Sequence, residues 1–287
     1  MSGKMAPVKG ESGYICFRNA SYSYPGSSGR AYAMQGINIT VRRGGFTAVM
    51  GANGSGKTTL ARHINGLLLP TSGEIIFDGL NTRDPANIFE IRRRVGFVFQ
   101  NPDNQLVGAT VEEDLAFGPE NAGLDPSVIR ESVAFAMRAA GIEHLAKRPP
   151  QALSGGQKQL VAIAGALAMK AECLVLDEPT AMIGPEGKRL VTGLLKEISS
   201  GLGITVILIT HFPEEAVLAD RVLVMDGGRI VMDGPPSEVF KSGSLLEETG
   251  LELPGPEELA RRLRRRGVAL PDPVLTVDEL VDGLCRL

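Results

Sequence analysis

The segment over residues 46–64 limits the fold of this chain more than any other part. Residues 46–50 (FTAVM) are an apolar run with the length of a buried strand, residues 51–58 read GANGSGKT, and residues 59–64 fit a helix. A strand that turns through glycines into a helix directs consecutive backbone N–H groups and the positive end of the helix dipole toward one point. We therefore expect a phosphate-binding loop within an α/β fold.

The eight residues match the pattern G-x-x-x-x-G-K-[ST], which is typical of loops that hold nucleotide phosphates. Lys57 is expected to reach the β- and γ-phosphates, and the hydroxyl of Thr58 to bind Mg²⁺. A glycine-rich turn with a surface lysine is the alternative, and the flanking strand and helix argue against it. The predicted nucleotide contacts of this loop are Gly51, Ala52, Asn53, Gly54, Ser55, Gly56, Lys57, Thr58 and Thr59.

Composition excludes several classes of protein. The 287 residues are 43% hydrophobic, and no apolar stretch approaches the roughly 18 to 20 residues of a transmembrane helix. The net charge of −3 and the pI of about 5.8 argue against a nucleic-acid-binding surface over the whole domain. Residues 1–13 lack the apolar core of a signal peptide, so we expect a disordered lead on a cytoplasmic protein. The three cysteines lack metal-ligand spacing and are expected to be reduced, mostly buried thiols.

The pattern of segments changes along the chain. Residues 14–77 alternate short β-like runs with glycine and serine turns, which favours an antiparallel sheet beside the phosphate loop. Residues 101–155 carry helical signals and predict a helical insertion. Residues 243–287 are rich in charge and proline and predict a small helical tail. Strands apolar on both faces, which indicate a parallel sheet, lie at residues 173–176, 205–209 and 221–225.

Two helix starts are marked in the sequence. Asp125 followed by Pro126 is suited to an N-cap and a first-turn proline. The apolar face predicted for this helix consists of Val128, Val133, Phe135 and Met137. A capping box over residues 276–279 (TVDE) predicts the start of a helix in the tail.

Two carboxylates, Asp177 and Glu178, follow the apolar strand at residues 173–176. In a parallel sheet, the edge where strands end also carries the phosphate loop. We expect Asp177 to hold Mg²⁺ through water, and Glu178 to orient and deprotonate an attacking water. The alternative is a strand that merely ends in charges before the turn at Pro179.

A second anion site is predicted at residues 153–157 (LSGGQ), directly before a helix over residues 158–169. Ser154 is suited to an N-cap, and Gly155 and Gly156 leave open N–H groups at the helix N-terminus. One nucleotide cannot use both anion sites of the same chain if the helical insertion holds them apart.

The LSGGQ segment, followed by a strand that ends in Asp-Glu, resembles the signature of ABC-type ATPases. The resemblance covers residues 14 to about 240 and implies a P-loop NTPase of the ABC-ATPase fold with ATP and Mg²⁺. In that family, the signature of one subunit contacts the γ-phosphate held by the phosphate loop of another. This implies nucleotide contacts from Ser154, Gly155, Gly156 and Gln157 across a pair of subunits.

The same resemblance assigns three further positions. Tyr24 matches the aromatic residue that stacks on adenine, with Tyr22 as the second candidate and a core tyrosine as the alternative. Gln100 matches the glutamine that contacts Mg²⁺ and links the nucleotide to the membrane partner. His211 matches the switch histidine that bonds the γ-phosphate. With Glu178 and Lys57, His211 completes the predicted catalytic set.

Residues 100–105 (QNPDNQ) resemble the energising ATPases of energy-coupling factor transporters, which import vitamins and transition-metal ions such as cobalt and nickel. The resemblance implies a position at the cytoplasmic face of the membrane. It also implies three partners: a second ATPase subunit, identical or paralogous, an integral membrane scaffold, and a substrate-binding membrane component. No nucleic-acid partner is expected.

The tail also looks like that group of ATPases, in which it helps two ATPase subunits to pair. Residues 250–254 (GLELP) carry this part of the resemblance, and the predicted division is a lead at 1–13, an ATPase domain at 14–242 and a dimerisation tail at 243–287. A solvated helix is the alternative for the tail. The arginines within residues 261–266 could also meet anionic lipid.

Two positions differ from the ABC pattern. Gly184 stands where the family usually has an aspartate that reaches across the dimer, and Leu160 stands where an arginine commonly follows the signature. Gly184 bears on coupling between subunits more than on ATP binding, so hydrolysis is still expected. A soluble ABC ATPase outside transport and a weakly hydrolysing partner subunit are the alternative functions.

Overall fold

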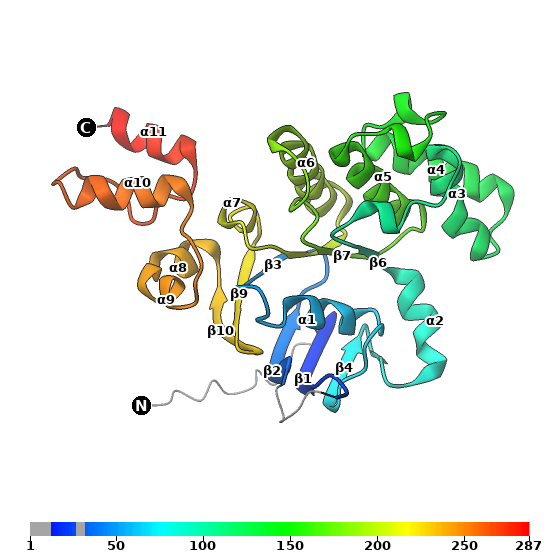
Figure 1. Ribbon diagram of the computed structural model, residues 1–287, viewed down its shortest axis with the longest axis horizontal. Helices are drawn as coiled ribbons and strands as arrows, with labels where there is room; N and C mark the ends of the chain where they lie inside the picture. The colour runs from blue at the N-terminus through cyan, green and yellow to red at the C-terminus, as the bar shows by residue number, and fades with distance from the viewer. Residues whose placement is uncertain (1–12, 27–31, 287) are drawn as a thin grey trace.

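The computed structural model describes residues 13–26 and 32–286 (Figure 1). Most of the predicted lead, residues 1–12, lies outside the described residues. The strands are β1 (Ile15–Tyr22), β2 (Met34–Val41), β3 (Phe46–Met50), β4 (Ser72–Phe77), β5 (Leu80–Asn81), β6 (Val95–Val98), β7 (Cys173–Asp177), β8 (Thr205–Ile209), β9 (Arg221–Asp226) and β10 (Arg229–Gly234). The principal helices are α1 (Lys57–Ile64), α2 (Pro85–Arg94), α3 (Val111–Asn121), α4 (Pro126–Ala139), α5 (Gly155–Ala168), α6 (Pro185–Leu202) and α7 (Pro213–Ala216).

A six-stranded sheet in the order β10-β9-β3-β8-β7-β6 forms the centre of the molecule. All of its neighbouring pairs are parallel except β10 with β9. Every residue of β3, β7 and β8 is buried, as expected for strands covered on both faces. The prediction of an α/β fold with a parallel core and an antiparallel sheet beside it is confirmed.

The two faces of the central sheet carry different layers, because side chains alternate along each strand. Phe46, Ala48 and Met50 of β3 pack in one core with α5 and α6. Val49 points to a second core, which includes Leu60 of α1 and the antiparallel sheet β2-β1-β4-β5. Figure 1 shows the central strands between these layers.

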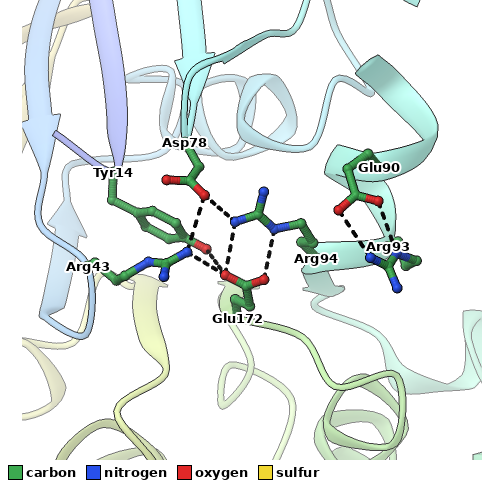
Figure 2. Close-up of polar contacts among 7 residues, drawn as sticks. All are labelled: Tyr14, Arg43, Asp78, Glu90, Arg93, Arg94 and Glu172. Carbon is green, nitrogen blue, oxygen red and sulfur yellow. Dashed lines mark hydrogen bonds and ion pairs between the residues drawn. The ribbon is translucent and has the colours of Figure 1, made fainter. Parts of the chain in front are cut away.

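A cluster of charged side chains joins the antiparallel sheet to the edge where the parallel strands begin (Figure 2). Glu172, directly before β7, accepts hydrogen bonds from Arg94 Nε at 2.9 Å and from Arg43 at 2.6 Å. Both arginines also bond Asp78, which follows β4. The hydroxyl of Tyr14, directly before β1, donates to Glu172 at 3.4 Å.

The physical chemistry of this cluster is that of a partly buried charge network. The hydrogen bonds from Arg94 lower the pKa of Glu172, and burial raises the pKa of the Tyr14 hydroxyl above its usual range. Glu172 and Asp78 remain about 40% exposed at their side chains, so each single pair contributes little free energy. Their joint effect is geometric, since five side chains from segments that flank the two sheets fix the orientation of one sheet relative to the other.

The helical insertion lies between β6 and β7, and residues 99–172, all described, contain no strand. The Asp125 side chain accepts from the N–H of Ser127 and caps α4, as predicted. The face of α4 that packs in the core includes Val133 and Ala136. Phe135 does not join this face. Its position between Val133 and Ala136 directs its side chain outward from the helix, and it is 41% exposed.

After β10 the chain forms α8 (Pro236–Lys241), and the predicted tail contains α9 (Gly243–Glu248), α10 (Gly255–Arg264) and α11 (Val277–Cys285). Figure 1 shows α10 and α11 apart from the insertion. Leu246 and Leu251 pack in the main core, whereas Ala260, Leu270, Val274 and Leu280 form a small core of their own. The predicted capping box of Thr276 and Glu279 is present. None of the helices in the described ranges is long and apolar enough to cross a membrane.

A buried carboxylate organises this small core. Glu257 has no exposed side-chain surface, and its Oε1 accepts from Arg261 Nε at 2.9 Å and from Arg264 at 2.6 Å. Its Oε2 accepts from the N–H of Val274 at 2.7 Å, which ties α10 to the segment before α11. Two members of the predicted arginine cluster are therefore used inside the tail.

Replacing Glu257 by Gln should loosen α10 and α11, because two arginines lose their buried counter-charge, a loss of roughly 3 to 5 kcal/mol. Amide hydrogen exchange of α10 and α11 measures this effect, and exchange in β3 and β8 should not change. Glu258→Gln is the matched control, since Glu258 pairs with Arg262 at an exposed site. Equal exchange in the two variants would contradict the assignment.

Candidate active site

The phosphate loop connects the end of β3 at Met50 to the start of α1 at Lys57. Gly56 has φ of 105°, and a Cβ there would lie 2.2 Å from the carbonyl oxygen of Ala33. A Cβ at Gly51 would lie 2.4 Å from the carbonyl oxygen of Met225. Glycine is therefore required at both positions, so that the loop can pass close to neighbouring backbone. The first N–H groups of α1 have no carbonyl of their own helix to bond.

Lys57 and Thr58 lie at the edge of the sheet where the parallel strands end. Lys57 Nζ donates to the carbonyl oxygens of Gly51 at 2.8 Å and Ala52 at 3.0 Å, and burial lowers its pKa. Thr58 Oγ1 donates to Asp177 Oδ1 at 2.9 Å. The structure thus joins the predicted metal ligand Thr58 to the predicted metal ligand Asp177. Burial raises the pKa of Asp177, which the bond from Thr58 opposes.

Glu178 lies at the centre of the remaining predicted groups. Its Oε2 accepts from Gln100 Nε2 at 3.3 Å and lies 3.4 Å from His211 Nδ1. Its Oε1 lies 3.9 Å from Lys57 Nζ. Three segments far apart in sequence therefore meet at one carboxylate, with a side chain only 15% exposed.

The backbone of Glu178 is held in an unusual conformation. Its φ is 49°, a left-handed value that costs free energy for a residue with a side chain. Its N–H donates to the carbonyl oxygen of Ile209 at 2.9 Å, so the chain turns sharply where β7 ends. The turn directs the carboxylate toward Gln100 and His211.

Tyr24 and Tyr22 have different surroundings. Tyr24 is 42% exposed, and its hydroxyl lies 3.1 Å from the hydroxyl of Thr59 in α1. The Tyr22 ring packs against the buried ring of His63, with centroids 4.9 Å apart, and against the second core. The two tyrosines meet edge to face at 5.0 Å. These positions favour Tyr24 as the stacking residue and give Tyr22 a packing role.

The LSGGQ segment forms the predicted helix start. Ser154 caps α5 by accepting from the N–H of Gln157, and the Gln157 side chain accepts from the N–H of Ser154 at 3.0 Å. A Cβ at Gly156 would lie 2.8 Å from Gly187 Cα, so this glycine permits close packing of α5 on α6. Figure 1 shows the start of α5 apart from α1, and no hydrogen bond between the described residues links Ser154 or Gln157 to the phosphate loop.

The two positions that depart from the ABC pattern differ in burial. Leu160 is 7% exposed and packs in the main core through α5. Gly184 is the N-cap of α6 with φ of −71°, and a Cβ there would meet nothing within 4 Å. The local backbone therefore does not require glycine at position 184.

The residues present fit ATP and Mg²⁺. Ser55 Oγ is buried and has no hydrogen-bond partner among the described residues, which suits an atom that faces a phosphate. Thr58, Asp177 and Gln100 provide oxygen ligands, which Mg²⁺ prefers. The described part of the chain holds no cluster of three or more His, Cys, Asp or Glu arranged for a metal ion.

Sequence reasoning gave no role to Glu215. This residue is 4% exposed in α7, and its carboxylate accepts hydrogen bonds from the hydroxyls of Thr180 and Thr210. Its sequence setting, Pro213-Glu214-Glu215, is typical of a solvated first turn. The sequence offers one signal for this contact of Glu215: Thr210 directly precedes His211, and Thr180 follows Glu178 by two residues.

Comparisons with known proteins identify the class. The family model described as ABC transporter matches residues 34–181, and these include the phosphate loop, LSGGQ and the Asp-Glu strand end. A structure of cbiO1 from Clostridium perfringens, 40% identical, superposes with a TM-score of 0.75 over 83% of this chain and 94% of that one. A dimeric ATP-binding cassette, MJ0796, is 29% identical, with a TM-score of 0.70 over 77% and 98% of the chains. The chain has the fold and the motifs of an ABC transporter ATPase, which binds and hydrolyses ATP.

The subfamily within the ABC transporter ATPases follows from similar curated relatives and from a family model that matches the tail. The energy-coupling factor transporter ATP-binding protein EcfA1 of Symbiobacterium thermophilum is 53% identical over 96% of this chain and 97% of its own length. EcfA1 of Caldanaerobacter subterraneus is 51% identical over 94% and 98%. The EcfA1 C-terminal domain model matches residues 246–287. The chain therefore belongs to the energy-coupling factor transporter ATP-binding proteins of the EcfA1 type, and the predicted family is confirmed.

Replacing Glu178 by Gln removes the proposed base and keeps its size. Turnover of ATP should fall by about 10²- to 10⁴-fold, while binding of ATP is retained. Phosphate release and nucleotide titration measure the two quantities. Glu197→Gln, on the exposed face of α6, is the control and should match the parent. Turnover of Glu178→Gln within about threefold of the parent would rule out a positioned base at this residue.

Tyr24→Ala should weaken ATP binding by about 1 to 3 kcal/mol, the cost of losing aromatic stacking on a base. Tyr24→Phe keeps the ring, loses the contact with Thr59 and should bind ATP nearly as the parent does. Tyr22→Ala should lower the melting temperature of the protein and change its ATP affinity less than Tyr24→Ala does, because the Tyr22 ring packs on His63. Calorimetric titration and thermal melts separate these effects. A larger affinity loss in Tyr22→Ala would reassign the stacking residue.

Proposed function

We propose that this ATPase energises an importer of vitamins or of transition-metal ions such as cobalt and nickel, at the cytoplasmic face of the membrane. The observation that carries the proposal is the meeting of Gln100, His211 and Lys57 at the carboxylate of Glu178. The tail supports the importer class, since it matches the EcfA1 C-terminal domain. The cbiO1 protein of Clostridium perfringens is part of the ABC transporter complex cbiONQ.

The proposed chemistry is in-line attack of water on the γ-phosphorus of ATP. A bond forms from the water oxygen to phosphorus, the bond to the bridging oxygen breaks, and ADP and phosphate leave. Glu178 takes the proton from the water, because its carboxylate is central to the site and only partly exposed. Thr58, Asp177 and Gln100 would hold Mg²⁺, which would supply positive charge to offset the charge of the phosphates.

Lys57 and His211 take the remaining roles. Lys57 leaves the carbonyl oxygens of Gly51 and Ala52 when phosphate is present, since an ammonium gains more from an anion than from a neutral carbonyl. His211 bonds the γ-phosphate from the side where it now faces Glu178. Tyr24 stacks on adenine. The loop residues Gly51 to Thr59 surround the phosphates with their N–H groups.

A second ATPase subunit completes the site. Ser154, Gly155, Gly156 and Gln157 lie at the start of α5, apart from the phosphate loop of the same chain, so they serve the nucleotide of the partner. The relative MJ0796 is a dimer bound to ADP and Pi in one solved state. We assign part of the pairing surface to α11, whose Val277, Val281 and Leu284 are 65%, 50% and 41% exposed at helical spacing.

An integral membrane scaffold docks at the insertion. A cavity of about 250 Å³ lies between α2, α3, α5 and β6, and Gln105 and Leu106 from the segment after Gln100 line it. Exposed apolar side chains stand on the same elements, with Phe89 70%, Val107 63% and Phe117 51% exposed. A membrane-coupling segment with an apolar surface fits this site. A substrate-binding membrane component would join through the scaffold.

Copurification tests the proposal. The tagged full chain, extracted from membranes in mild detergent, should carry an integral membrane protein and a second ATPase chain. The double variant Phe89→Asp and Val107→Asp should lose the membrane protein and keep the second ATPase. Leu190→Asp, which changes a 51% exposed side chain on α6, is the control and should keep both.

The variant Val277→Asp with Val281→Asp should weaken pairing with the second ATPase, measured by light scattering with ATP present. Recovery of ribosomes or of no membrane protein from the parent would contradict a role in transport. Transport of cobalt, nickel or a vitamin into vesicles that carry the purified complex then identifies the solute.

A further inference from the structure

One buried contact joins the two loops that carry Glu178 and His211. Glu215 Oε2 accepts from Thr210 Oγ1 at 2.7 Å, and Oε1 accepts from the Thr180 hydroxyl. Glu215 is 4% exposed, and the two threonines are each 1% exposed. The contact is therefore shielded from water, where a hydrogen bond to a carboxylate is strong.

Each threonine is fixed next to a proposed catalytic group. Thr180 lies two residues after Glu178, within the turn in which the N–H of Ala181 donates to the carbonyl oxygen of Glu178 at 3.2 Å. Thr210 directly precedes His211, and its N–H donates to the carbonyl oxygen of Val49 in β3 at 3.1 Å. A movement of either loop would change the distance between its threonine and Glu215.

The chemistry of the contact requires a carboxylate. Thr210 Oγ1 accepts from the N–H of Phe212 at 3.0 Å, so its proton is directed to Glu215. The Thr180 hydroxyl donates to the other carboxylate oxygen. The two hydroxyls donate to two different oxygens, and a carboxylate has two acceptor oxygens whereas an amide has one. A glutamine of the same size would leave one hydroxyl without its acceptor in a buried site.

We propose that Glu215 is a positioning residue that sets the distance between Glu178 and His211, and thereby the rate of ATP hydrolysis. It acts through Thr180 and Thr210, whose hydroxyls its carboxylate holds. The inference rests on the proposed roles of Glu178 and His211. A residue that served only to fill the core would affect stability without a selective effect on turnover.

The test compares conservative variants of the full chain, purified with its partners. Glu215→Gln should lower kcat by about 10- to 100-fold, the loss that a displacement of about 1 Å at a reacting group produces. ATP affinity should stay within about twofold of the parent, because the hydrogen bonds of the Glu215 carboxylate among the described residues go to Thr180 and Thr210 rather than to the phosphate loop. Glu214→Gln, the exposed neighbour on α7, is the matched control and should keep the parent kcat.

The threonines provide a second series, which holds even if Glu215→Gln folds poorly. Thr180→Val and Thr210→Val keep the shape and lose the hydroxyl, so each should lower kcat with little change in affinity. Thr180→Ser and Thr210→Ser restore the donor and should recover most of the parent rate. Equal rates in the Ser and Val variants would overturn the proposal.

A double variant distinguishes a failure of the role proposed for Glu215 from a failure of the role proposed for Glu178. In a Glu178→Gln background, Glu215→Gln should cause little further loss of kcat, because the base whose distance from His211 it sets is already absent. A full additional loss would overturn the proposal, as would a kcat for Glu215→Gln within about twofold of the parent. If instead Glu178→Gln alone keeps its turnover, the assigned base is wrong, and the fault lies with the proposed function.

Discussion

The register of the parallel strands is the constraint on which the site depends. Asp177 of β7 pairs with Ile209 of β8, and Ile209 pairs with Val49 of β3, so three strands end at nearly one level. The segments that follow them carry Glu178, His211 and the phosphate loop. Parallel strands end at the same edge of a sheet, and groups that are between 33 (Glu178 to His211) and 160 (Gly51 to His211) residues apart in sequence therefore meet. A shift of one strand by one residue would turn its side chains to the other face and disperse these groups.

The site gathers charges that would each be unfavourable alone. Burial lowers the pKa of Lys57 and raises that of Asp177, so in isolation each charged form is disfavoured. The nearby carboxylates of Glu178 and Asp177 oppose the shift of Lys57. The left-handed backbone of Glu178 adds strain at the same point. The strands of the central sheet hold this arrangement, together with the charge network at the edge where the parallel strands begin. In a less constrained fold, these side chains would move apart.

Local patterns in the sequence predicted much of the fold and of the site. The phosphate loop, the cap at Asp125 and the capping box at Thr276 depend on neighbouring residues, which a sequence displays directly. Contacts between distant segments were not predictable in this way, and the bonds from Thr180 and Thr210 to Glu215 belong to them. The cysteines show the same limit, since Cys173 is buried in β7, whereas Cys285 at the end of α11 is exposed. Their burial depends on the packing around them, which their spacing does not encode.

The structure excludes a local backbone requirement as the reason for glycine at position 184. Its φ and ψ of −71° and 171° are open to any residue, and the space around its Cα admits a side chain. An aspartate would cap the 18-residue helix α6 and place a negative charge at its positive end. Relative to glycine, the cap contributes a few tenths of a kcal/mol and the charge about 0.3 to 1 kcal/mol in favour of the fold. Within this chain, then, glycine is less favourable than the residue that its family usually carries. The fold of one subunit gives no reason for glycine at this position, whereas the segment after Glu178 would face the second ATPase in the proposed pair. A partner with its own aspartate at this position would leave the two ATP sites chemically different, so hydrolysis would proceed at unequal rates in the two sites.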